Sequence, residues 1–442
     1  MKLKSLVALF LFIAVGLSNA QMKEIEFEEY DLDNGMHVIL YQDNTTPIVT
    51  VSVQYHVGSK NEKADRTGFA HFFEHLMFEG SEYIERGKYF DIVQRNGGTL
   101  NAFTSFDQTY YYETLPSNQL ELALWLESER MLHLKIDSTG VETQRKVVKE
   151  ERSQRYDNQP YGSWQEEMFK RAFTKHPYNW TPIGSAQYID EAKISEFMDF
   201  YKMYYNPNNA VLTVAGDIDK AESKKMIEEY FGDIKNNDVE IVRPDVVEPA
   251  KTEEVRHVVY DNIQLPGVIM GYSIPAQGTD DYYALSMLNT LLATGQSSRM
   301  YKELVDNSQT AVSAGSFPIA LEDPGLIVIF GIANMGVEID NLEAAIQKEI
   351  DKVKNEMISD KEFEKLRNQT ESSYVSNFFS VSGIAQNLAQ YHTFFGDANL
   401  INTEIERYMD VTKEDIQRVA QEYLKDTNRV VLHYLPKSAE AN

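Results

Sequence analysis

The sequence contains no cysteine among its 442 residues. A chain without cysteine forms no disulfide, offers no thiolate to a metal ion and has no cysteine nucleophile. Any bound metal must therefore be held by histidine and carboxylate side chains. Positive charge is also scarce, because 42 lysines and arginines stand against 68 aspartates and glutamates, for a formal net charge of −26. Such a surface repels nucleic acid and anionic membranes, so we expect neither as a partner.

Long hydrophobic runs are missing after the first twenty residues, so we expect no stable membrane span in the rest of the chain. At the N-terminus, Lys2 and Lys4 precede an apolar run over residues 6–17, and small residues follow as far as Ala20. This pattern is typical of a secretory signal peptide, and the run is short for an uncleaved anchor. We predict cleavage near Ala20 and export to the periplasm or the medium.

The length of the chain is too great for one ordinary domain, and its order of elements repeats. Residues 200–214 predict a helix, an asparagine-bearing turn and a strand, and residues 419–433 repeat that order. Further correspondences join a strand at 47–57 to one at 266–274, and a hairpin at 99–115 to one at 311–332. We therefore predict an α+β fold of two homologous halves, each a mainly antiparallel sheet packed with helices.

The predicted division of the chain follows from this repeat. Residues 236–254 contain Pro244, Pro249 and many charges without helical periodicity, as a linker between domains does. The predicted parts are a signal peptide at 1–20, an N-terminal α+β domain at 21–235, the linker at 236–254 and a C-terminal α+β domain at 255–442.

The strongest chemical signal is the sequence His71-Phe-Phe-Glu74-His75, inside a helix predicted at 67–78. Residues four apart lie on one face of a helix, so both imidazoles can bind one ion at about 2.0–2.1 Å, the distance usual for zinc. Glu74 projects close to the same face and can accept a proton from water activated by the metal. The motif places the metal site in the N-terminal domain, and the C-terminal domain lacks it.

A catalytic zinc ion has three protein ligands and one position open to water. The candidate source of the third ligand is a predicted helix over 141–156, which carries Glu150 and Glu151. Successive helix residues point about 100° apart, so only one of the two faces the metal. Spacing alone leaves both open.

The motif is followed by Leu-Met-Phe-Glu-Gly-Ser at residues 76–81, and the distal helix carries Val-Val-Lys-Glu-Glu. Together these stretches resemble the M16 metallopeptidases, the pitrilysin and insulinase group called inverzincins. The resemblance covers nearly the whole mature chain. In its length and its two-half layout, the chain most resembles the short subfamily that includes the processing-peptidase subunits. It implies one Zn²⁺ per chain, held by His71, His75 and Glu151, with Glu74 as the catalytic base.

The resemblance also implies residues around the metal. The family's substrate-binding edge strand corresponds to Asn101-Ala102-Phe103-Thr104, whose backbone would pair with an extended peptide substrate. The family often has a glutamate seven residues before the distal ligand, and this chain has Gln144 there. Glutamine donates and accepts hydrogen bonds but brings no charge, so it would support the metal ligands more weakly.

A larger departure lies in the second half. The family places an arginine and a tyrosine, which bind substrate and stabilise the oxyanion, after a stretch present here as residues 297–301, Ser-Ser-Arg-Met-Tyr. In this chain, Val305 and Val312 stand where the family has the arginine and the tyrosine, and neither valine side chain donates a hydrogen bond. Losing an oxyanion donor costs about 10²–10³ in rate. The chain is then either a slow or specialised enzyme, or one whose partner supplies both groups.

We favour the partner: a heterodimer with a related subunit that supplies the arginine and tyrosine and helps enclose a chamber, with a homodimer as the variant. The predicted function is an exported zinc metalloendopeptidase that hydrolyses peptides or unfolded segments. The alternative is a non-catalytic binding or assembly subunit of the same fold. Such members usually lose the motif that this chain keeps, and nothing in the sequence selects another class of zinc hydrolase.

The other polar residues have no such pattern. Three histidines fall on predicted strands as ordinary core or edge residues, namely His37, His56 and His433. Four more have no partner pattern: His133, His176, His257 and His392. Asp107 lies in a predicted turn, where aspartate is favoured in any case.

Overall fold

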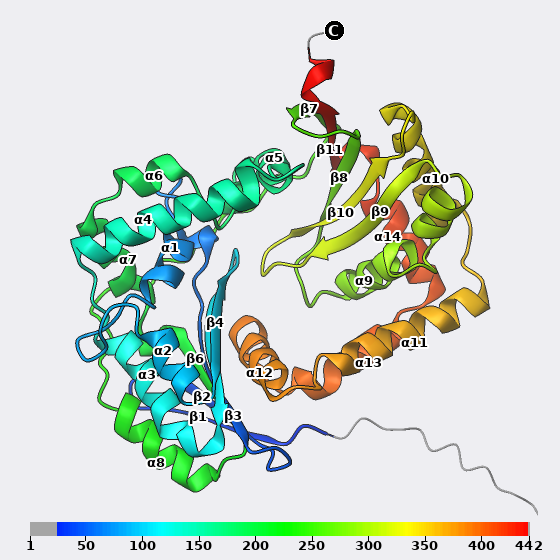
Figure 1. The fold of residues 1–442 in the computed structure, drawn as a ribbon. Coiled ribbons are helices and arrows are strands. Elements are labelled where there is room, and N and C mark those ends of the chain that lie inside the picture. Colours follow the sequence, from blue (N-terminus) through cyan, green and yellow to red (C-terminus); the bar gives the residue numbers. More distant parts are fainter. Residues whose placement is uncertain (1–23, 441–442) are drawn as a thin grey trace, which may run out of the picture.

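The structure of the protein is a computed structural model that describes residues 24–440. The predicted signal peptide lies outside the described residues. The N-terminal half forms a six-stranded sheet in the order β1-β2-β6-β3-β5-β4 (Figure 1). Its strands are β1 (Phe27–Asp31), β2 (His37–Gln42), β3 (Ile48–Tyr55), β4 (Thr99–Thr104), β5 (Thr109–Pro116) and β6 (Ala210–Gly216).

The C-terminal half forms a five-stranded sheet in the order β7-β11-β8-β10-β9. Its strands are β7 (Val255–Asp261), β8 (Gly267–Ile274), β9 (Ala311–Ile319), β10 (Gly325–Ala333) and β11 (Arg429–Pro436).

The two sheets share one topology. β2 runs parallel to β6, as β7 does to β11, and the remaining neighbours from β6 to β4 and from β11 to β9 are antiparallel. Within the described residues, only the first sheet has an additional edge strand, β1. The predicted counterparts occupy equivalent places, since β3 matches β8 and the β4–β5 hairpin matches β9–β10. The predicted α+β fold of two similar, mainly antiparallel halves is confirmed.

Helices surround both sheets (Figure 1). Those of the first half are α1 (Phe69–Leu76), α2 (Tyr89–Arg95), α3 (Leu120–Leu132), α4 (Ser138–Arg152), α5 (Trp164–Ala172), α6 (Ala186–Glu191), α7 (Ile194–Tyr204) and α8 (Lys220–Phe231). Those of the second half are α9 (Asp280–Ala293), α10 (Ile339–Asn355), α11 (Asp360–Ser376), α12 (Val381–Phe395), α13 (Leu400–Asp410) and α14 (Lys413–Tyr423).

Two π-helical segments, η3 (Ser153–Asp157) and η6 (Tyr301–Asn307), continue the helical pattern. Thus the helix predicted at 141–156 is α4 followed by η3, and a 3₁₀ turn, η2, precedes α3. The remaining 3₁₀ turns are η1 (Ser59–Asn61), η2 (Ser117–Gln119), η4 (Pro177–Asn179), η5 (Pro207–Asn209), η7 (Asp426–Asn428) and η8 (Lys437–Ala439).

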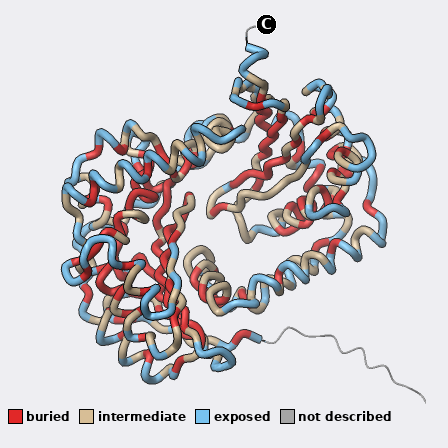
Figure 2. The backbone as a smooth tube through the Cα atoms, viewed as in Figure 1, coloured by how far each residue is buried: buried red, intermediate tan, exposed pale blue. Residues whose placement is uncertain are grey.

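Each half exchanges one helix with the other. α12 of the second half packs on the first sheet, where Leu388 joins a buried cluster with Ile39 and Val211. In return, α5 of the first half packs on the second sheet, where Phe169 joins a cluster with Ile269. Both sheets are therefore covered on two faces, and their inner strands are largely buried (Figure 2).

The exchange interlocks the two halves around their common interface.

Between α8 and β7 the chain forms no helix or strand, and the boundaries predicted at 236–254 stay a prediction. Among residues 24–440, no helix combines the length and apolar character that a bilayer span requires.

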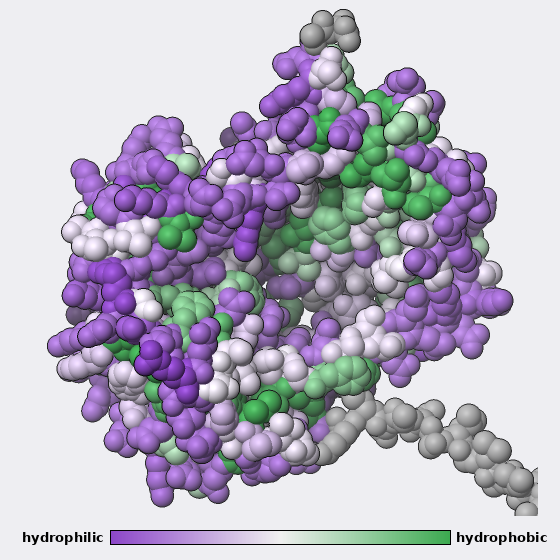
Figure 3. All heavy atoms as spheres, in the orientation of Figure 1, coloured by the Kyte–Doolittle hydropathy of each residue, from purple (hydrophilic) through white to green (hydrophobic). Residues whose placement is uncertain are grey.

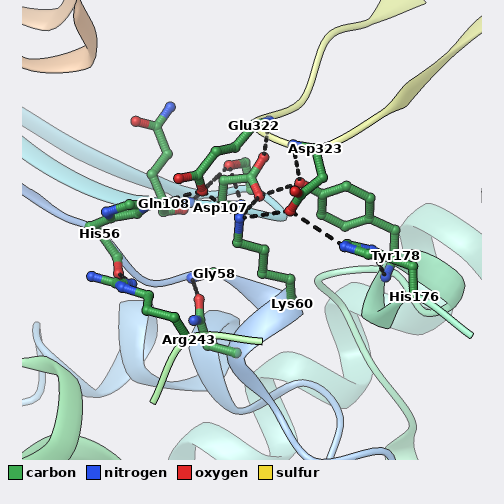
Figure 4. A network of polar contacts seen from close by, with 12 residues as sticks. His56, Gly58, Lys60, Asp107, Gln108, His176, Tyr178, Arg243, Glu322 and Asp323 are labelled. Atoms are coloured by element: carbon green, nitrogen blue, oxygen red, sulfur yellow. Dashed lines mark hydrogen bonds and ion pairs between the residues drawn. The ribbon is translucent and has the colours of Figure 1, made fainter. Parts of the chain in front are cut away.

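A buried polar network also joins the halves (Figure 4). The ammonium group of Lys60 lies 3.0 Å from Asp107 Oδ1 and 3.2 Å from Asp323 Oδ2, and it also pairs with Glu322. The backbone N–H of Glu322 donates to Asp107 Oδ2 at 3.1 Å. Asp107 and Lys60 belong to the first half, whereas Glu322 and Asp323 form the turn between β9 and β10. One lysine therefore neutralises carboxylates from both halves.

Two histidines complete this network. His56 Nε2 lies 2.9 Å from Glu322 Oε2, and His176 Nε2 lies 3.3 Å from Asp323 Oδ2. Burial raises the pKa of Glu322, but the contacts with His56 and Lys60 outweigh it and lower that pKa to about 2. The hydrogen bond from His176 and the charge of Lys60 lower the pKa of Asp323 to about 2. No local pattern indicated a partner for His56 or His176, because their partners lie in the other half.

Candidate metal centre and active-site cavity

The start of helix α1 is fixed by a glycine and a buried carboxylate. Gly68 has a φ of 96°, a left-handed conformation that strains other residues, so the helix begins at Phe69 rather than at the predicted Thr67. The carboxylate of Glu62 accepts hydrogen bonds from the N–H groups of Gly68 and Ala70, each at 2.8 Å. These bonds satisfy amides that have no partner within the helix.

Aromatic packing then orients the helix. Phe69 and Phe72 lie on one side of α1, and each ring centroid is 4.7 Å from that of Phe197 on α7. Phe73 stacks on Phe200, which also lies on α7. Because this apolar side is held against α7, the side that carries the motif's histidines and Glu74 turns toward α4 and β4.

Helix α4 brings Glu151 to both motif histidines. Its Oε2 lies 3.0 Å from His75 Nε2 and 3.5 Å from His71 Nε2. Ligand atoms around a tetrahedral zinc ion lie about 3.3 Å apart, as follows from zinc–nitrogen and zinc–oxygen distances of about 2.0–2.1 Å. The neighbouring Glu150 points elsewhere and accepts a hydrogen bond from Gln154 at 2.7 Å. Of the two carboxylates that spacing left open, Glu151 is the one beside the histidines.

The chemistry of these three donors fits a zinc ion. One atom from each lies within 4.8 Å of the others. Burial and the neighbouring His75 lower the pKa of His71 to about 4, so its imidazole is neutral near pH 7 and has a lone pair to offer. Burial raises the pKa of Glu151, but the hydrogen bond with His75 and nearby positive charge lower it by more. Two imidazoles and one carboxylate are a donor set of catalytic zinc sites.

Glu74 stands beside the three donors and not among them. Thr104 Oγ1, at the end of β4, donates a hydrogen bond to Glu74 Oε2 at 2.6 Å. Burial raises the pKa of Glu74, although the bond from Thr104 lowers it. A carboxylate with a raised pKa is a stronger base, which suits proton transfer near neutral pH.

The predicted substrate strand, Asn101 to Thr104, forms most of β4. This strand ends its sheet, so within residues 24–440 its outer edge has no neighbouring strand. Its backbone groups on that edge can pair with an extended peptide, and one of them, the N–H of Ala102, donates to Asn101 Oδ1 at 3.0 Å. The strand and the metal donors line the same cavity of about 990 Å³.

The second half closes this cavity from the opposite side. Its lining includes residues 318–321 at the end of β9, together with Gln390 and Phe394 of α12. Figure 3 shows a hollow in this face of the molecule between the two halves, with hydrophobic side chains along its wall. The candidate site is therefore enclosed by both halves of one chain.

Three residues that the resemblance singled out lie apart from the donors. Gln144 lines the cavity, but its amide donates to Glu79 Oε1 at 2.5 Å, and no described hydrogen bond joins it to a donor residue. Val305 is half-buried against the core of the second half. Val312 is the second residue of β9 and is 47% exposed. Neither valine lines the cavity beside the metal donors.

The sequence reasoning missed Arg155. Its guanidinium lies 2.7 Å from Glu151 Oε1, the oxygen that does not face the histidines. Arg155 also lines the cavity. The spacing of four residues from a glutamate to an arginine on a helix was the available signal, because such pairs meet on one helix face.

Comparison with known proteins agrees with the fold. Residues 37–184 match the family described as Insulinase (Peptidase family M16), and residues 193–370 match the Peptidase M16 inactive domain. The chain belongs to the M16 peptidase family. It is 32% identical over 430 residues to the zinc protease PqqE of Helicobacter pylori, covering 96% of this chain and 97% of that one.

A solved structure and a plant protein are similar as well. The crystal structure of a protease from Helicobacter pylori superposes with a TM-score of 0.89 at 32% identity, over 93% of this chain and 100% of that chain. The probable mitochondrial-processing peptidase subunit beta of Arabidopsis thaliana is 24% identical, covering 89% of this chain and 76% of the plant protein. The predicted family is confirmed.

Proposed function

We propose that the chain is an exported zinc metalloendopeptidase that hydrolyses peptides or unfolded segments. The observation that carries the proposal is the meeting of His71, His75 and Glu151 beside Glu74, in a cavity that also contains the free edge of β4. The names of relatives as zinc proteases support the choice of metal and of reaction.

His71, His75 and Glu151 would hold one zinc ion. When bound, such an ion polarises the scissile carbonyl and lowers the pKa of a water molecule to about 7. Glu74 then accepts the proton of the attacking water and delivers it to the nitrogen of the departing amine. Thr104 holds the carboxylate of Glu74 in place for both transfers. Arg155 holds the second oxygen of Glu151 and so fixes the direction in which that carboxylate points.

The substrate would lie extended along β4. Backbone pairing with Asn101 to Thr104 gives affinity with loose demands on sequence. The cavity is enclosed by both halves and takes an extended strand more readily than a folded domain. This favours short peptides and unfolded segments as substrates.

A related partner subunit is the second part of the proposal. Val305 and Val312 offer no hydrogen-bond donor, and neither lines the cavity, so another chain would supply the family's arginine and tyrosine. One relative is named as a subunit of a processing peptidase, which supports the assembly of such chains. The alternative is a non-catalytic assembly subunit, for which these two valines are the supporting observation. Export rests on the sequence of residues 1–20.

The test is hydrolysis of a mixed set of quenched fluorescent peptides by the chain from Gln21 onward. It is assayed alone, with a chelator and with zinc restored. Activity that the chelator removes and zinc restores is the expected result. Activity that survives complete removal of metal would contradict the proposal, and zinc binding without hydrolysis would reject a stand-alone enzyme in favour of the partner.

A further inference from the structure

One arginine brings positive charge into the active-site cavity. Among the described residues that line this cavity, Arg155 is the only lysine or arginine. The carboxylates of the lining belong to Glu74, Asp107 and Glu151, and the ammonium group of Lys60 lies 3.0 Å from Asp107 Oδ1. The chain as a whole is strongly acidic, with a formal net charge of −26. A lone arginine in this setting is therefore a specific feature of the cavity and not part of a general basic surface.

The pair of Arg155 with Glu151 leaves most of the guanidinium unused. Its Nη1 lies 2.7 Å from Glu151 Oε1, and the side chain of Arg155 is 73% exposed, whereas that of Glu151 is 15% exposed. No hydrogen bond or ion pair within residues 24–440 involves Nε or Nη2 of Arg155. An arginine has five N–H donors in a planar fork that matches the two oxygens of a carboxylate. Donors therefore remain for a group that enters the cavity.

The backbone keeps this side chain beside the metal donors. Arg155 belongs to η3, the π-helical segment that continues α4 beyond Glu151. Single π-helical turns are rare and occur frequently at functional sites. Arg155 contacts a donor residue, and an extended peptide advances about 3.3 Å per residue, so the substrate group that it reaches lies within about two residues of the scissile bond.

The charges around the metal donors also leave Arg155 available. A divalent cation brings two positive charges, and the carboxylates of Glu74 and Glu151 bring two negative charges. The imidazoles of His71 and His75 are neutral when they act as ligands. With such a cation bound, the positive charge of Arg155 is therefore not balanced within this group, and it attracts an anion.

We propose that Arg155 binds a carboxylate of the peptide substrate and gives the enzyme a preference for an acidic group near the scissile bond. This inference rests on the proposed peptidase function and adds the class of substrate. The carboxylate belongs either to an aspartate or glutamate side chain or to the C-terminus of a short peptide. Both present two oxygens that the guanidinium fork can hold with two parallel hydrogen bonds.

A second arginine of the first half provides a matched control. Arg95 Nε lies 2.7 Å from Asp91 Oδ1, four residues earlier on α2, and the side chain of Arg95 is 75% exposed. Arg95 does not belong to the described lining of the cavity. A glutamate or aspartate paired with an arginine four residues later can also serve the helix alone. Since the two pairs share spacing, distance and exposure, a difference between them reports what the cavity adds.

The experiment measures peptide binding to the zinc-loaded Glu74→Gln variant, in which turnover is slow, and hydrolysis by the unchanged protein. Fluorescence anisotropy compares peptides that carry one glutamate at successive positions with the same peptides carrying glutamine. Each peptide is made with a free and with an amidated C-terminus, which distinguishes the two sources of the carboxylate. The expected result is binding about 3- to 10-fold tighter for glutamate at one position or for the free C-terminus, with the same preference in kcat/KM.

Variants of Arg155 then test the residue itself. Arg155→Gln should abolish the preference, and Arg155→Glu should reverse it in favour of peptides with lysine at that position. Arg155→Lys should restore part of it, because an ammonium group keeps the charge without the planar fork. Arg95→Gln should leave the preference unchanged. Zinc is present in excess, and its content is measured in every variant, because Arg155 also contacts Glu151.

Three outcomes would overturn the inference. Equal binding and hydrolysis of acidic and neutral peptides by the protein with Arg155 present would do so and would leave the proposed function intact. A preference that persists in zinc-loaded Arg155→Gln would also do so. Absence of both peptide binding and hydrolysis would reject the proposed function of the chain on its own, and the inference with it. Should Arg155→Gln fail to retain zinc, Arg155→Lys serves instead, and an undiminished preference would contradict recognition by the guanidinium fork.

Discussion

His75 Nε2 lies 3.0 Å from Glu151 Oε2, although 76 positions separate the two residues in the sequence. The contact depends on the packing of α1 against α7 and on the approach of α4 to α1. It places one carboxylate beside two imidazoles, and it distinguishes Glu151 from the glutamate that precedes it.

Replacing Glu151 tests this distinction. Glu151→Gln removes the charge that faces both imidazoles, so we expect zinc affinity at the motif site to fall by several orders of magnitude and hydrolysis to be lost. Glu150→Gln is the matched control, because Glu150 is exposed and its carboxylate accepts from Gln154 instead of facing the histidines. Titration with zinc measures both variants. Equal effects of the two substitutions would show that the assignment is wrong.

Thr104→Val removes the hydroxyl that orients Glu74 while keeping the shape of the side chain. A hydrogen bond to a charged group is worth about 1.5–3 kcal/mol, so kcat should fall by about 10- to 100-fold with a smaller change in KM. Thr99→Val, an exposed position at the start of the same strand, should leave both constants unchanged. Steady-state kinetics on one peptide decides, and an unchanged kcat in Thr104→Val would exclude the orienting role.

The network in Figure 4 predicts a loss of stability in Lys60→Met. The side chains of Lys60 and Asp107 are 6% and 4% exposed, so the substitution leaves the buried carboxylate of Asp107 without its cation. Breaking a buried pair in this way costs about 3–5 kcal/mol of unfolding free energy. Lys413→Met breaks a pair with an exposed aspartate and should change little. Urea unfolding measures the midpoints of both variants. Similar midpoints for Lys60→Met and Lys413→Met would contradict a stabilising role of Lys60.

The same network predicts a dependence of stability on pH. Glu322 and Asp323 have pKa values of about 2 in the fold, below the ordinary values of 4.5 and 3.8. Carboxylates with lowered pKa values stabilise the fold above their ordinary values, and this contribution disappears as the pH falls toward 2. The difference in urea midpoint between the protein and Glu322→Gln should therefore shrink between about pH 4.5 and 2. A difference that is constant over this range would show that the ion pairs do not contribute.

The features that depend on local spacing could be predicted from the sequence. The four-residue separation of His71 and His75 predicts a shared helix face, and the repeated order of elements predicts two sheets of one topology. Both are properties of short segments, so hydrophobic period and turn residues suffice to recognise them.

The remaining features depend on which distant segments meet. The apolar face of α12 is visible in its sequence, but nothing local says that it packs on the sheet of the other half. For the same reason, His37 and His392 had no recognisable partner pattern, although their rings are stacked. The choice between Glu150 and Glu151 likewise follows from how α4 is rotated against α1, which spacing within α4 does not determine.

The most direct test of the central claim is the comparison of Glu74→Gln with the unchanged protein, in which zinc content and peptide hydrolysis are measured on the same preparations. Glu74 is not among the three metal donors, so the account predicts equal zinc content. Loss of a general base lowers the rate by about 10²–10⁴-fold, so hydrolysis should fall to that extent. Hydrolysis at the original rate, or loss of zinc together with activity, would contradict the assignment of Glu74 as the base.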